Sequence, residues 1–70
     1  MKSYVRVEDM KGYQNITTVM EDGEYHQYSV WPDGVVTSAT KSTVQAMGWR
    51  STREFLSEKK GFSLVRNAPL

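Results

Sequence analysis

Residues 15–36 read NITTVMEDGEYHQYSVWPDGVV, and their pattern predicts the centre of a β-sheet. It contains three runs rich in Val, Ile, Thr and aromatic residues, separated by the triplets EDG and PDG. Such runs favour β-strands, and such triplets favour tight hairpin turns. The stretch therefore predicts a three-stranded antiparallel meander, with strands near residues 15–20, 24–31 and 35–39.

The turns also determine which side chains share a face of the sheet. In WPDGVV, Pro32 presets φ at the first turn position and Gly34 can adopt the left-handed conformation of a bulge, so that Trp31 faces Val35 across a three-residue loop. The same treatment of EDG pairs Ile16 with Tyr28. One face then carries Ile16, Met20, Tyr28, Val30 and Val36, and the other carries Val19, Tyr25, Gln27, Ser29, Trp31, Val35, Thr37 and Ala39. A two-residue turn at residues 22–23 would instead move Ile16 and Met20 to the other side of the middle strand.

The flanking sequence adds further elements. YVRVE at residues 4–8 alternates apolar and charged residues, which indicates a strand with one wet face. KSTVQAMGW at residues 41–49 predicts a short helix that stops at Gly48, and the capping-box spacing of Ser51 and Glu54 predicts a second helix over about Thr52–Lys60. FSLVR at residues 62–66 predicts a short last strand, and residues 67–70 a frayed tail.

The predicted fold is α+β: a small antiparallel sheet of three to four strands, two short helices packed on one face, and a short C-terminal strand. A chain of 70 residues has surface and volume for a single core, so we expect one domain over residues 1–70. Two short helices can hardly cover both faces of the sheet, so one face should stay open. Trp31, one of two tryptophans, is then either a core residue on the covered face or a contact residue on the open one.

Composition argues against catalysis and metal binding. The chain has no cysteine and one histidine, His26, which excludes disulfides, thiolate metal sites and cysteine nucleophiles. Glu54 and Glu58 are four residues apart on one side of a predicted helix, but we expect that side to face water, without the cleft that acid–base catalysis by paired carboxylates needs. We therefore expect no enzyme activity, no cofactor and no metal. Without a signal-like apolar run or a stretch of about 20 apolar residues, we also expect no membrane association and a cytoplasmic location.

The charges are unevenly distributed. The net charge is +1, but residues 1–34 carry three basic and six acidic side chains, giving −3, and residues 35–70 carry six basic and two acidic ones, giving +4. Basic residues beside an aromatic residue can bind single-stranded nucleic acid by charge neutralisation and stacking. This alternative function would use Trp49, Arg50, Arg53, Lys59, Lys60 and Arg66. Residues 42–62 also have loosely the form of a helix-turn-helix.

The preferred hypothesis is a non-catalytic binding protein, a small intracellular regulator or inhibitor of the kind that phages and mobile elements encode. Its protein-interaction residues would be Tyr25, Trp31 and Val35, displayed with Val19 on the open face, because aromatic residues are enriched at interface hot spots. Self-association is the other way to occupy such a face. The partner is thus expected to be a protein or a second copy of the chain.

Overall fold

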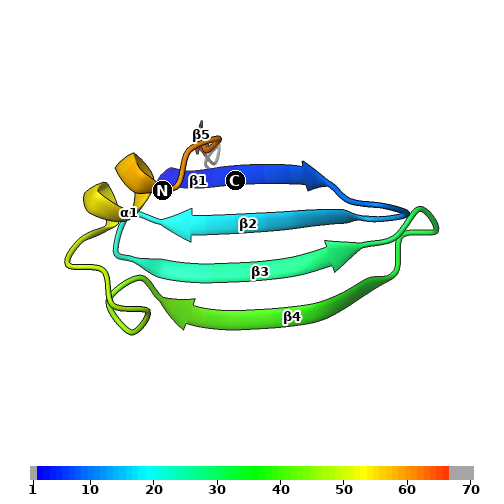
Figure 1. Ribbon diagram of the computed structural model, residues 1–70, viewed down its shortest axis with the longest axis horizontal. Helices are drawn as coiled ribbons and strands as arrows, with labels where there is room; N and C mark the ends of the chain where they lie inside the picture. The colour runs from blue at the N-terminus through cyan, green and yellow to red at the C-terminus, as the bar shows by residue number, and fades with distance from the viewer. Residues whose placement is uncertain (1, 67–70) are drawn as a thin grey trace.

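The computed structural model describes residues 2–66, with the side chain of Ser38 outside the description. It contains one antiparallel sheet and one short helix (Figure 1). The strands are β1 (Lys2–Asp9), β2 (Gln14–Met20), β3 (Glu24–Val30), β4 (Val36–Thr43) and β5 (Ser63–Arg66), in the order β4-β3-β2-β1-β5, and the helix is α1 (Thr52–Glu58). The α+β prediction is confirmed in its coarse form. The described residues contain four consecutive strands, within the expected three to four, and the expected short C-terminal strand β5, but one helix where two were expected. The predicted tail at residues 67–70 lies outside the described residues.

The predicted register of the meander is confirmed. Ile16 pairs with Tyr28 across β2 and β3, and Val30 pairs with Val36 across β3 and β4. The amide of Gly23 donates to the Met20 carbonyl oxygen at 2.9 Å, which closes the three-residue loop and excludes the two-residue turn. The side chains up to Thr37 therefore lie on the faces assigned to them. Beyond it, a register shift between Gln27 and Ser29 places Thr40, in place of Ala39, opposite Gln27.

The helix predicted over residues 41–49 is wrong. Lys41, Ser42 and Thr43 belong to β4 and pair with His26, Tyr25 and Glu24 of β3. Residues 44–48 form a turn in which the Met47 amide donates to the Thr43 carbonyl at 3.1 Å, and Gly48 ends it with φ of +98°. Ladder hydrogen bonds to β3 use the backbone groups that a helix would need, so only one turn forms.

The second helix begins at Thr52, as predicted. The Ser51 side chain accepts a hydrogen bond from the Glu54 amide at 3.1 Å, as in a capping box, whereas the Glu54 carboxylate bonds Arg50 Nε at 3.0 Å. The helix ends at Glu58, two residues earlier than expected, because Lys59 has an extended conformation. A seven-residue helix is marginal alone, so its stability must come from packing.

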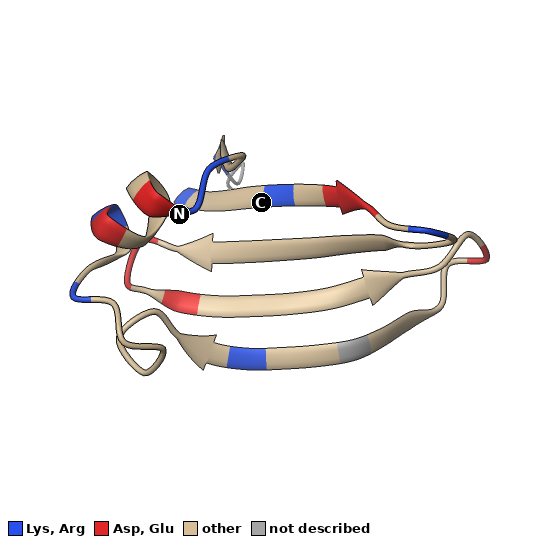
Figure 2. Ribbon diagram, viewed as in Figure 1, with Lys and Arg blue, Asp and Glu red and all other residues tan. Residues whose placement is uncertain are grey.

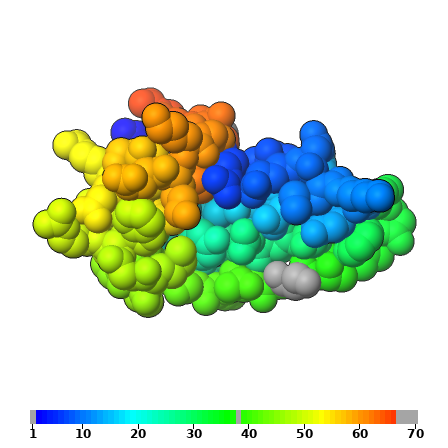
Figure 3. Space-filling model, in the orientation of Figure 1, coloured from blue at the N-terminus to red at the C-terminus, as the bar shows by residue number. Residues whose placement is uncertain are grey.

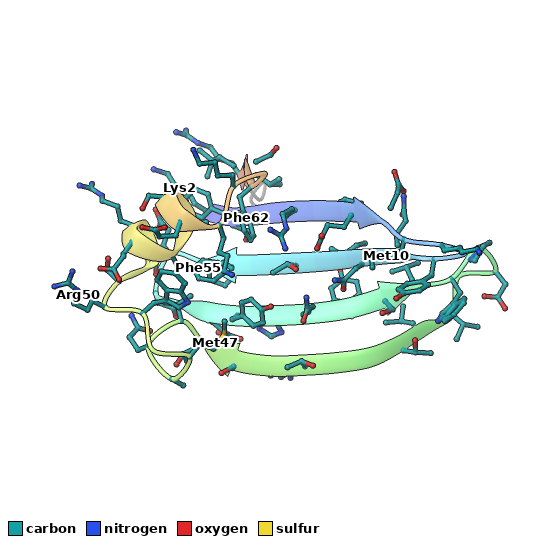
Figure 4. All side chains as sticks on the ribbon, viewed as in Figure 1. Lys2, Met10, Met47, Arg50, Phe55 and Phe62 are labelled. Carbon is teal, nitrogen blue, oxygen red and sulfur yellow. The ribbon has the colours of Figure 1, made fainter. Side chains whose placement is uncertain are left out.

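The core lies at one end of the sheet. Its fully buried apolar side chains are Val19, Val44 and Phe55, at 0%, 0% and 3% exposure. Phe55 is the one buried residue of α1, and its ring meets three other rings edge-on, those of Tyr25, Trp49 and Phe62, at centroid distances of 5.6 to 6.0 Å. Figure 4 shows Phe55 directed from α1 toward the sheet, with Phe62 nearby.

The helix and its flanking loops cover the face that carries Val19 and Tyr25, and only at this end. In Figure 3 the atoms of residues 44–62, drawn from green-yellow to orange, lie over one half of the molecule, and the strands remain visible in the other half. Arg6 ties the segment after α1 to the sheet: its guanidinium lies 5.4 Å from the Phe62 ring centre and donates to the Lys60 carbonyl. The opposite face has no described segment packed on it.

Candidate functional site

Trp31 lies at the end of the sheet farthest from α1, where β3 turns into β4. Its amide donates to the Val35 carbonyl at 2.9 Å, and the Gly34 amide donates back to the Trp31 carbonyl at 2.8 Å. Asp33 Oδ1 accepts from the Val35 amide at 3.1 Å, and Gly34 has φ of +88°. The predicted three-residue loop is thus confirmed, and it holds the Trp31 backbone in one conformation.

The indole ring is fixed on two sides, and Trp31 as a whole remains 39% exposed. Its Nε1–H donates to Thr37 Oγ1 at 2.8 Å, and the ring lies against that of Tyr13, with centroids 4.9 Å apart and planes inclined by 34°. A side chain that is already ordered loses little rotamer entropy when a partner covers it. Exposed, ordered aromatic residues therefore make efficient contacts.

Two shallow hollows adjoin the ring. The first lies between the two hairpins at this end and is lined by residues that include Asp9, Met10, Tyr13 and Trp31, and the second is bounded by Trp31, Pro32, Asp33, Val35 and Thr37. Val35 is 51% exposed, and Met10 is also exposed. We call this region, formed by Met10, Tyr13, Trp31, Pro32 and Val35, the Trp31 surface. Figure 4 shows Met10 at this end, away from the helix.

The sequence predicted that Tyr25, Trp31 and Val35 lie together on an open face. The structure does not bring Tyr25 together with the other two. Val19 is fully buried, and Tyr25 is half-buried with its ring against Phe55. Trp31 follows Tyr25 on the same face, but the six-residue interval along the strand separates them by roughly 20 Å. Trp31 is thus on the face that the helix covers, but beyond the reach of the helix.

Tyr13 and Met10 were missed at the sequence level. The signal for Tyr13 was present, because the pairing of Ile16 with Tyr28 extends to Gln14 and Val30 and leaves Tyr13 next to Trp31. Met10 had no comparable signal, since its position follows from the turn at residues 10–13, where its amide donates to the Tyr13 carbonyl at 2.8 Å.

The basic residues considered for nucleic-acid binding gather at the helix end of the molecule, among acidic ones (Figure 2). Arg50 pairs with Glu54 at 3.0 Å, and the nearby Lys2 approaches Glu21 at 3.9 Å. Trp49 is half-buried and packs edge-on against Phe55, so its ring serves the core. Arg53, Lys59, Lys60 and Arg66 are exposed. The structure therefore brings cations together without the stacking surface that the hypothesis assigned to Trp49.

The one histidine of the chain contacts a carboxylate. His26 lies on the face opposite the helix, where Nε2 meets Glu24 Oε1. Within residues 2–66 no three or more metal-ligating side chains cluster. The same residues contain no helix with the length and apolar character needed to cross a membrane.

Comparison with protein-family models, with curated proteins and with solved structures finds no match to this chain. The assignment of a function therefore rests on the geometry of its surfaces.

Proposed function

We propose that this chain is a non-catalytic binding module that engages a protein partner through the Trp31 surface. The observation that carries the proposal is the Trp31 ring, exposed yet fixed by Thr37 and Tyr13. Tryptophan is the residue type most enriched at interface hot spots, and a pre-ordered ring avoids part of the entropic cost of binding.

The neighbouring charges favour a protein over a nucleic acid. Asp9 and Asp33 line the two hollows beside the ring. A phosphate backbone would be repelled by these carboxylates, whereas an apolar or basic protein surface would not. Occupying such a surface is the way in which a small regulator or inhibitor acts. A cysteine-free chain is suited to the reducing cytoplasm in which we place it.

The test compares wild-type protein with Trp31→Ala as baits for binding partners, with Leu64→Ala as the matched control. Leu64 is also an exposed apolar residue, on the same sheet face but at the other end, in β5. We expect Trp31→Ala to weaken partner binding at least about tenfold, as removal of a hot-spot residue does, and Leu64→Ala to leave it unchanged. Unfolding midpoints of both variants show that the fold is retained.

Salt dependence separates this function from the nucleic-acid alternative. Binding through the Trp31 surface should change little between low and physiological salt, because the contact is mainly apolar. Binding that falls steeply with salt, survives Trp31→Ala and is lost on Arg53→Glu with Lys60→Glu would instead establish the basic residues as the site.

A further inference from the structure

We infer that the open face of the sheet, opposite α1, binds a second copy of this chain. This inference does not depend on the proposed function, because the Trp31 and Val35 side chains lie on the other face; open-face residues such as Asp9 and Val30 only border the first hollow beside Trp31. The open face is defined by side chains that the register places together on the side away from Val19, and its apolar members are Val5, Val7, Ile16, Met20, Tyr28, Val30, Val36 and Val65.

The open face carries apolar side chains that the small core of the chain leaves exposed. Only three apolar side chains in the described chain are fully buried, whereas Val7, Val36 and Val65 are 53%, 55% and 43% exposed on the open face. A domain of this size buries a small apolar core, and oligomerisation adds to its stability by burying more apolar surface. Covering this face would convert a half-exposed layer of valine, isoleucine and tyrosine into a second core.

The open face also has enough area for a dimer interface. Strand spacing and rise give the face roughly 500 Å² per copy, counting five strands of about six residues. Two copies would bury about 1,000 Å² in total, which is the lower bound for a specific interface. The buried area is therefore about the minimum for a specific interface, which fits a weak, concentration-dependent dimer.

Two charged residues of the open face, Asp9 and Lys41, are placed so that they can pair between two copies. The apolar residues form a diagonal band from Val65, at the β5 corner, to Val36, at the far end of β4. The two remaining corners are polar. Asp9 lies at one, beside Gln14, and Lys41 lies at the other, beside the His26 and Glu24 side chains, which contact each other. Within residues 2–66 neither Asp9 nor Lys41 has an ionic partner.

A two-fold axis that runs along the apolar band accounts for both the band and the oppositely charged corners. It places the apolar band of one copy on that of the other and exchanges the polar corners, so that Lys41 of each copy faces Asp9 of the other. The strands then cross at nearly right angles, which is one of the two preferred packings of sheet on sheet. An isologous contact of this kind closes on itself and stops at the dimer.

The test is the mass in solution, measured by sedimentation velocity from low micromolar to submillimolar concentration. Wild type should pass from the 8.0 kDa monomer to twice that mass. Val7→Lys should weaken the dimer at least tenfold, because it buries a charge, and Val35→Lys should not. These variants are matched, since Val7 and Val35 are 53% and 51% exposed and lie on opposite faces. If Val7→Lys fails to fold, Val36→Lys takes its place on the open face.

The axis is tested by charge exchange. Asp9→Lys and Lys41→Asp should each weaken the dimer, and the double variant should recover it, because every contact then again pairs opposite charges. A wild type that stays monomeric at all concentrations overturns the inference, as does a dimer that survives Val7→Lys and Val36→Lys. A double variant that does not recover overturns the axis. Because Val35→Lys alters the Trp31 surface alone, failure of dimerisation and failure of the proposed function give different results.

Discussion

Thr17 lies in the middle of the central strand, between Arg6 and Gln27 of the neighbouring strands. It is 1% exposed, and no atom of residues 2–66 forms a hydrogen bond with its Oγ1. A buried hydroxyl without a partner costs free energy, since it loses its hydrogen bonds to water on folding. Here the threonine contributes the shape of a β-branched side chain, and its hydroxyl contributes nothing to stability.

We therefore expect Thr17→Val to raise the free energy of unfolding by about 1 kcal/mol, because a methyl group of the same shape replaces the hydroxyl. Urea denaturation followed by tryptophan fluorescence measures the change. Thr17→Ser, which keeps the hydroxyl and removes the methyl group, is the control and should lower stability. A loss of stability in Thr17→Val would mean that the hydroxyl has a partner, such as a buried water molecule.

At the scale of the element, the β3–β4 hairpin depends on Gly34. Its φ of +88° lies in the left-handed region, and an added Cβ would meet nothing within 4 Å. Any cost of a substitution is then a backbone cost alone, about 1 to 2 kcal/mol for an L-residue. We expect Gly34→Ala to destabilise the protein by this amount and Gly34→Asn, which tolerates the left-handed region, to cost less. Equal losses for the two variants in thermal unfolding would show that φ is not the cause.

The hairpins were predictable from sequence because their determinants are local. Pro32 and Gly34 set the turn, and the turn sets the pairing of Val30 with Val36. The helix predicted at residues 41–49 failed because pairing with β3 is a tertiary effect that overrides a weak helical pattern. Local sequence patterns likewise could not predict which face of the sheet the helix covers. The helix and its flanking loops cover the less apolar face of the sheet, because Phe55, Trp49 and Phe62 of that segment supply most of the apolar area of the contact.

The candidate site also has local features, which the sequence predicted, and tertiary features, which it did not. The position of Trp31 beside a three-residue loop followed from local turn chemistry. Its separation from Tyr25 did not, because that depends on where α1 docks along the strand. Tyr13 reaches Trp31 from the other hairpin, through the register of β2 with β3.

At the scale of the whole molecule, the core and the Trp31 surface occupy opposite ends of one sheet. The helix end contains the buried residues Val19, Val44 and Phe55, and the far end has hydrogen-bonded strands with few buried side chains. Local opening is easiest where few apolar contacts must be broken. The far end should therefore open more often than the helix end, although the same strands run through both.

Amide hydrogen exchange along β2 measures this difference directly. Because β2 pairs on both sides, its amides all lie within the ladder, and differences among them report opening rather than missing bonds. In dilute solution we expect protection to rise at least about tenfold from Gln14 toward Val19. At high concentration a dimer on the open face would cover Ile16 and Val30 and raise protection at the far end. Uniform protection along β2 in dilute solution would mean that the sheet opens as one cooperative unit, held together by its ladder more than by the core at its end.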